Sequence, residues 1–204
     1  MNYLMKGTLF AVALGAVSLG AVAQNATPTT TPATKSPVIN ERKDNQQQRI
    51  GEGVENGSLT ANEASKLERK ETKLNVEEKR MKADGKLSAA ERARLTRQQN
   101  SLSKQIYNQK HDAQTQNLNP KSEVGKRQRA QQQRIGEGIE NGSLNAREAS
   151  RLERQETHLN REVARDRAAN GGTLTAAEKA KVNRQQNHES KRIYRQKHDA
   201  QVRR

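Results

Sequence analysis

The sequence predicts an all-α protein in which two tandem three-helix units follow a signal peptide and a disordered linker. Three observations predict this organisation. Beyond Pro37 the chain is charged and rich in Gln, with sparse Leu, Ile and Val at helical spacing and no run of alternating β-branched residues. A turn built on Gly, Leu and a capping residue occurs four times, and long blocks of sequence return at a nearly constant offset.

The composition limits the size of the hydrophobic core. The chain has 204 residues, of which 30% are hydrophobic and 30% charged, and its formal net charge is +15. Such a composition argues against the large core of an enzyme. Cysteine is absent, so no disulfide can brace an exported domain.

The first 38 residues read as a leader and a spacer. Lys6 precedes an apolar run from Leu9 to Val22, and Ala21-Val22-Ala23 fits a signal-peptidase site, so we expect a signal peptide over 1–23 and an exported, periplasmic or secreted protein. The run falls short of the ~20 apolar residues of a spanning helix, and no transmembrane segment is expected after cleavage. The Pro- and Thr-rich stretch 24–38 is expected to be disordered.

The rest of the chain is duplicated. Gln46–Gly53 returns as Gln131–Gly138, an offset of 85 residues, and Arg97–Gln114 returns as Arg184–Gln201, an offset of 87. We therefore expect a first repeat over 39–116 and a second repeat over 117–204.

Six helix starts are predicted from apolar residues that precede a capping residue. In four of them Glu follows three residues after the cap, which is the signature of a capping box. Gly57, Gly85, Gly142 and Gly171 precede these turns and suit the left-handed residue that ends a helix. In a fifth, Pro120 suits the first helical position. The six pairs are Ile39-Asn40, Leu59-Thr60, Leu87-Ser88, Leu118-Asn119, Leu144-Asn145 and Leu174-Thr175, and the four Glu residues are Glu63, Glu91, Glu148 and Glu178.

Each predicted helix carries one narrow apolar stripe. The seven-residue step from Leu67 through Leu74 to Met81 favours nearly parallel or antiparallel packing. So few apolar residues predict a modest core, marginal stability and self-association that would cover the stripes. The stripes of the first repeat are Ile50 and Val54, then Leu67, Leu74 and Met81, then Leu95, Leu102 and Ile106.

The repeated turn has a second interpretation as a weak divalent-metal module. Asp84–Glu91 resembles the second half of an EF-hand calcium loop, but Arg80 and Lys82 stand where its first two ligands would be. Helix capping explains the same residues without a metal. No cofactor is therefore predicted.

Two resemblances to known families follow from short motifs. Three of the turns carry Leu followed by Thr or Ser, with Glu three residues later: Leu59–Glu63, Leu87–Glu91 and Leu174–Glu178. This pattern resembles the Leu-Thr-x-x-Gln motif of the Spy and CpxP family of helical periplasmic chaperones. That resemblance implies a basic scaffold that holds unfolding clients. The Ile-Tyr-x-x-Lys-His-Asp ending of each repeat resembles an uncharacterised family of exported bacterial tandem-repeat proteins, which implies no mechanism.

The third helix of each repeat carries a polar stripe that is a candidate partner-binding face. Its residues are Asn100, Ser103, Tyr107 and His111 in the first repeat and Asn187, Ser190, Tyr194 and His198 in the second. A hydrogen-bonded seam between helices would explain the same pattern, and a weak metal site would use His111 with Asp112 and His198 with Asp199. His158 and His188 lack counterparts in the first repeat and are expected on the surface.

The charge favours an anionic partner. Residues 41–116 hold 16 Lys and Arg against 12 acidic residues, and residues 121–204 hold 20 against 11. Export removes nucleic acid as a partner, so an anionic envelope component or a protein client is expected. Pairing of these cations with Glu at i+4 would account for part of the pattern.

No nucleophile, phosphate loop or catalytic triad motif is found, so the protein is not expected to be an enzyme. The sequence predicts a helical binding protein of the cell envelope. A Spy-like chaperone or stress protein is the alternative.

Overall fold

The computed structural model describes residues 37–119 and 121–202. These residues form six α-helices and one short 3-10 helix, and they contain no strand, which confirms the all-α fold. The expected signal peptide and most of the expected linker lie outside the described residues. The elements are α1 (Pro37–Asn56), α2 (Ala61–Met81), η1 (Lys82–Asp84), α3 (Ala89–Lys110), α4 (Glu123–Glu140), α5 (Ala146–Ala169) and α6 (Ala176–Lys197).

Four helices begin where the capping pattern predicts. At α2 the Glu63 amide donates to the Thr60 hydroxyl (3.3 Å), and the Thr60 amide donates to the Glu63 carboxylate (2.9 Å). Ser88, Asn145 and Thr175 form the same reciprocal box at α3, α5 and α6. The predicted capping boxes are therefore confirmed.

The predicted starts of α1 and α4 are wrong. Asn40 lies inside α1, because Pro37 occupies the first turn, where its missing N–H costs nothing; the linker expected over 24–38 thus overlaps this helix. The N-cap of α4 is Ser122, whose hydroxyl accepts from the Gly125 amide (3.0 Å). Asn119 lies in the preceding loop, where its carbonyl accepts from the Ser122 amide (3.3 Å).

The main core cluster is shared by both repeats. It joins residues of the first repeat, such as Ile50, Leu67 and Ile106, to residues of the second, such as Ile135 and Leu152, while two smaller clusters each lie within one repeat. Of the predicted stripe residues, Leu74 and Met81 are only partly buried, while the others are buried. The narrow stripes are therefore covered within the chain. Most of their residues pack across the two repeats, whereas Leu95 packs with Ile39 and Leu87 of its own repeat.

The repeats meet through reciprocal contacts. The Ser65 hydroxyl donates to the Ser150 carbonyl and the Ser150 hydroxyl to the Ser65 carbonyl, both at 3.1 Å. Gly51 of α1 faces Glu140 of α4, and Gly136 faces Glu55 in the same way. This exchange of equivalent partners is the pattern of a twofold axis, here within one chain. The axis passes between α1 and α4, whose paired contacts show that they run antiparallel, and between α2 and α5.

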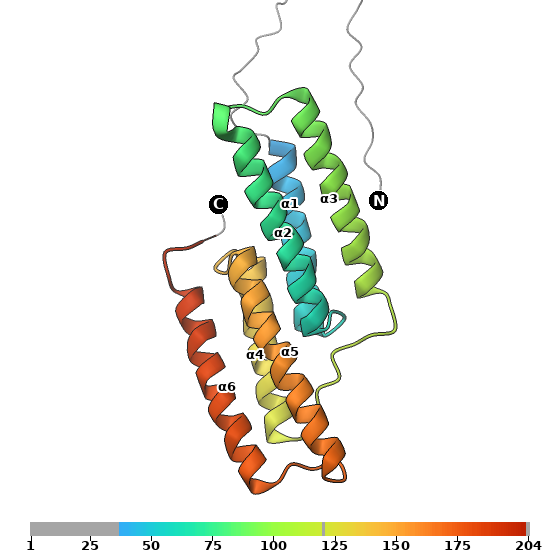
Figure 1. Cartoon of the computed structure of the whole chain (residues 1–204), viewed down its shortest axis with the longest axis vertical. Helices are drawn as coiled ribbons and strands as arrows, with labels where there is room; N and C mark the ends of the chain where they lie inside the picture. The colour runs from blue at the N-terminus through green and yellow to red at the C-terminus, as the bar shows by residue number, and fades with distance from the viewer. Residues whose placement is uncertain (1–36, 120, 203–204) are drawn as a thin grey trace, which may run out of the picture. The chain divides into compact units, whose positions relative to one another are not determined.

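The outer helices complete each repeat. Helix α3 packs on α1 and α2, and α6 packs on α4 and α5. In Figure 1, α2 and α5 both lie in front of α1 and α4, with α3 and α6 beside them. Rotation about a twofold axis does not move a helix from one end of the axis to the other. The outward faces of α2 and α5, which this rotation exchanges, therefore lie on the same side of the bundle.

Candidate functional site

The predicted polar stripe is divided between two roles. Its first half is a seam: Gln46 Nε2 donates to the Ser103 hydroxyl (2.8 Å) and to the Gln99 carbonyl (2.6 Å), and Arg42 donates to the Asn100 amide oxygen (2.8 Å). These bonds fix α3 on α1. In the second repeat Gln131 binds Ser190 (3.2 Å) and Arg127 binds Asn187.

The second half of the stripe is exposed. Tyr107 stacks on His111 with ring centroids 4.2 Å apart, and Tyr194 stacks on His198 at 4.1 Å. The two tyrosines are 57% and 62% exposed. Each histidine Nδ1 lies 2.7 Å from the carbonyl oxygen of the tyrosine one turn earlier, so this nitrogen donates. The Tyr–His pairs remain candidate partner contacts at the ends of α3 and α6.

The structure does not assemble a metal site from the predicted ligands. Among residues 37–119 and 121–202, no group of three or more His, Asp and Glu side chains is arranged to hold a metal ion. The Asp112 carboxylate accepts from the Gln114 amide (2.8 Å), and the Asp199 carboxylate accepts from the Gln201 amide (2.7 Å). Each of these carboxylates thus closes its own turn.

The carboxylates of the repeated turn are also engaged. In the EF-hand-like copy the Asp84 carboxylate accepts from the Lys86 amide (3.2 Å), and Glu91 accepts from the Ser88 amide (2.8 Å). The carboxylate oxygen atoms that an EF-hand loop would use to bind calcium therefore accept hydrogen bonds from backbone amides.

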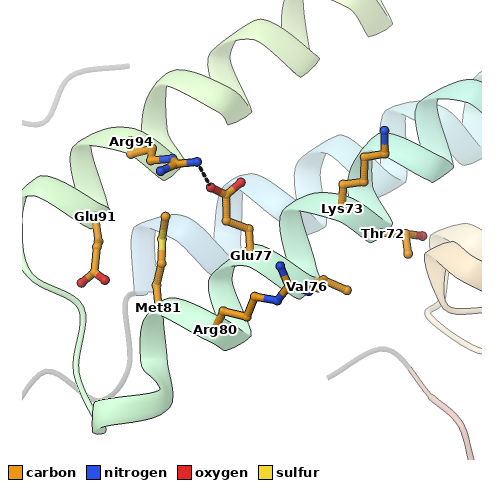
Figure 2. Close-up of a pocket in the computed structure, with 8 residues that line it drawn as sticks. All are labelled: Thr72, Lys73, Val76, Glu77, Arg80, Met81, Glu91 and Arg94. Carbon is orange, nitrogen blue, oxygen red and sulfur yellow. Dashed lines mark ion pairs between the residues drawn. The ribbon is translucent and has the colours of Figure 1, made fainter.

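A groove of about 730 Å³ lies between α2 and α3. Figure 2 shows Met81 and Glu77 rising from α2 toward α3, where Arg94 forms an ion pair with Glu77 (2.5 Å). Val76 belongs to the same groove and is 46% exposed. The groove therefore offers a small apolar area between charges of both signs.

The exposed charge on α2 and α5 has a single sign. These two helices carry ten acidic residues, and every one is buried or partly buried. All six Lys and Arg of α2 and five of the six Arg of α5 are exposed. Most follow one stripe along each helix. We define the α2–α5 basic face as the exposed cations of these stripes: Lys66, Arg69, Lys73 and Arg80 of α2, and Arg147, Arg151, Arg154, Arg161 and Arg165 of α5.

The acidic residues of the same helices form part of a polar core. Gln47 Nε2 donates to both oxygens of Glu68 (3.1 Å each), and Gln132 Nε2 donates to Glu153 (3.2 Å). Burial raises the pKa of Glu153 to about 8, opposed by the Gln132 hydrogen bond. Burial, and then the charges of Glu153 and Glu189, raise the pKa of Glu156 well above its usual range.

The core of the second repeat contains a carboxyl group where the first repeat has an apolar side chain. Leu102 belongs to the main core cluster, whereas the equivalent residue of the second repeat is Glu189, whose pKa burial raises to about 7. Glu189 also lines a groove of about 240 Å³ between α5 and α6 together with His158 and His188. Both histidines are exposed, as predicted, and the fold brings them to the same groove.

Sequence reasoning missed the α2–α5 basic face and the buried carboxylates. Neither apolar periodicity nor the total charge of each repeat carries this signal. Plotting acids and bases separately on a helical wheel would have found the signal, because Lys66, Arg69 and Lys73 share one side of α2 while Glu68 and Glu71 lie on the other.

Comparison of the chain with protein-family models, curated proteins and solved structures finds no match. In the part of the chain that the structure describes, no helix combines the length and apolar character needed to cross a bilayer.

Proposed function

We propose that this protein is a non-enzymatic binding protein of the cell envelope that recognises anionic partners through the α2–α5 basic face. The observation that carries the proposal is the separation of charge across these helices. Their carboxylates turn inward and their Lys and Arg side chains turn outward, so the outward field is positive and attracts anions.

The opposite side of the bundle supports a one-sided interaction. Where α1 crosses α4, Glu52, Glu55 and Glu137 lie near Glu140, and after burial their charges raise the pKa of Glu140. At this crossing Lys110 pairs with Glu52 (3.3 Å) and Lys197 pairs with Glu137 (3.1 Å), so charges of both signs lie there, whereas the exposed charge on α2 and α5 has one sign. The α2–α5 basic face is therefore the favoured surface.

Few contacts within the chain neutralise this face. Among the described residues, the ion pairs of the face and its neighbours are Arg165 with Asp166 (3.1 Å), Arg94 with Glu77 and Lys181 with Glu162 (2.8 Å). The sequence alternative, pairing of cations with Glu at i+4, accounts for Lys82 with Glu78. Most of the outward charge is thus available to a partner.

The chaperone alternative is favoured by a different observation, the exposed Val76 in the α2–α3 groove (Figure 2). An aggregation assay on a denatured client separates the two functions. Suppression that survives high salt would support client capture, since apolar contacts are not screened. No suppression at stoichiometric protein would reject it.

The anion-binding proposal is tested with fluorescently labelled heparin as a soluble polyanion. A face variant carries Arg69→Gln, Arg151→Gln and Arg154→Gln. A control variant loses the same charge away from the face, through Lys121→Gln, Lys126→Gln and Arg129→Gln. If each face cation contributes about 0.5 kcal/mol, the face variant binds about tenfold more weakly than the control. Equal losses in the two variants would reject a defined site.

A further inference from the structure

We propose that the α2–α5 basic face docks on the phosphate groups of an anionic membrane surface. This inference rests on the proposed function and specifies its partner. It follows from the length, the breadth and the chemistry of the face.

The length of the face comes from the reciprocal packing of α2 and α5. Ser65 and Ser150 mark the axis, and Arg80 and Arg165 each lie fifteen residues further along their helices. At a rise of 1.5 Å per residue each arm extends about 22 Å. The antiparallel arms run in opposite directions from the axis, so the two stripes together span about 45 Å on one side of the bundle.

The breadth of the face comes from the outer helices. The ion pairs Glu77–Arg94 and Glu162–Lys181 place exposed cations of α3 and α6 beside the acid residues at the edges of α2 and α5. Arg97 and Arg184 are exposed one turn further along α3 and α6. Neighbouring helix axes lie about 8–10 Å apart. The cations therefore occupy an area and not a single line, which fits a plane of headgroups better than one linear polymer.

The chemistry of the face favours phosphate. All five exposed cations of α5 are arginines, whose planar guanidinium groups bind phosphate oxygens in pairs. Among the described residues of α2 and α5, Val76 is the one large hydrophobic side chain that is exposed. Docking therefore depends on charge and not on insertion, and it should weaken as salt shortens the range of the attraction.

The experiment is co-sedimentation of the purified chain with vesicles that mix phosphatidylglycerol and phosphatidylethanolamine, beside vesicles of phosphatidylcholine alone. Each basic residue near an anionic surface changes the partition coefficient about fivefold. The face variant with three cations removed should therefore partition about 100-fold more weakly than the unchanged chain. The control variant, whose substitutions lie outside the face, should lose much less.

Binding to the anionic vesicles that fails selectively in the face variant, and that is absent with phosphatidylcholine, supports the proposal. Equal losses in the face and control variants overturn it. Soluble polyphosphate and duplex DNA are titrated in parallel at the same phosphate concentration. If either binds the face more tightly than the vesicles do, the partner is a linear polyanion and the membrane proposal is wrong. If the unchanged chain binds heparin but not the anionic vesicles, only the membrane proposal is wrong; if it binds neither, the proposed function itself is rejected.

Discussion

Replacing Glu189 by Leu should stabilise the protein, and the gain should grow with pH. The substitution gives the second repeat the residue that the first repeat has at position 102, where Leu102 is buried in the core. In the unchanged chain Glu189 faces Glu153 and Glu156 of α5, with Arg192 on its own helix and Arg134 of α4 as the nearby cations. Burial favours the protonated form of each carboxyl group in this cluster and raises its pKa.

The sign of the pH effect follows from the raised pKa values. A carboxyl group whose pKa is raised on folding contributes stability below its unfolded pKa and loses it as pH rises through the folded pKa. The pKa of Glu153 is 4.5 in the unfolded chain and about 8 in the folded chain. The free energy of unfolding therefore falls by about 3 kcal/mol between pH 5 and pH 8. Glu189, raised to about 7, adds about 2 kcal/mol in the same window.

Urea unfolding at pH 5 and pH 8 measures both effects. The unchanged chain should be less stable at pH 8. Glu189→Leu should remove its own share of that loss and part of the loss from Glu153, because the Glu189 charge contributes to the raised Glu153 pKa. The reverse substitution Leu102→Glu should create a new pH dependence in the first repeat. Stability of the unchanged chain that is flat or rises from pH 5 to pH 8 would show that folding does not raise the pKa values of these carboxyl groups.

Three further predictions concern packing, capping and metal binding. Gly51→Ala should cost about 1–3 kcal/mol in urea unfolding, because its Cβ would lie 2.9 Å from the Gly136 carbonyl oxygen, and an unchanged midpoint would contradict the close α1–α4 contact. Thr60→Ala should cost about 1 kcal/mol through loss of the α2 capping box, whereas a Thr60→Ser variant should keep most of the stability. Calorimetry with calcium should give no binding heat and no shift in thermal unfolding, because Glu63 and Glu91 already accept backbone donors; a saturable heat would contradict this.

The helices were predictable because their signals are local. A capping box occupies four consecutive residues, so Thr60 and Glu63 identify the start of α2 without any knowledge of the tertiary structure. The same locality explains the errors at α1 and α4. Asn40 and Asn119 follow apolar residues as the pattern requires, but Pro37 and Ser122 lie in better positions to begin these helices.

The amino-acid sequence alone does not show that the two repeats pack against each other. Ile50 and Ile135 have identical surroundings in the sequence, and nothing there says that they share a core. A glycine at the same place in both repeats, Gly51 and Gly136, is a sequence signal for this packing, because glycine allows two backbones to approach closely. The polar stripe contains residues of two kinds that the sequence could not separate, because Ser103 binds α1 whereas Tyr107 is exposed.

Mapping the contact residue by residue shows whether anions bind on the α2–α5 basic face. Backbone amide NMR signals of the labelled chain are followed during titration with a short heparin oligosaccharide. If anions bind on this face, the largest shifts fall on α2 and α5, around Arg69 and Arg154, and they diminish with added salt. Shifts concentrated on α1 and α4, or spread evenly over all six helices, would contradict it.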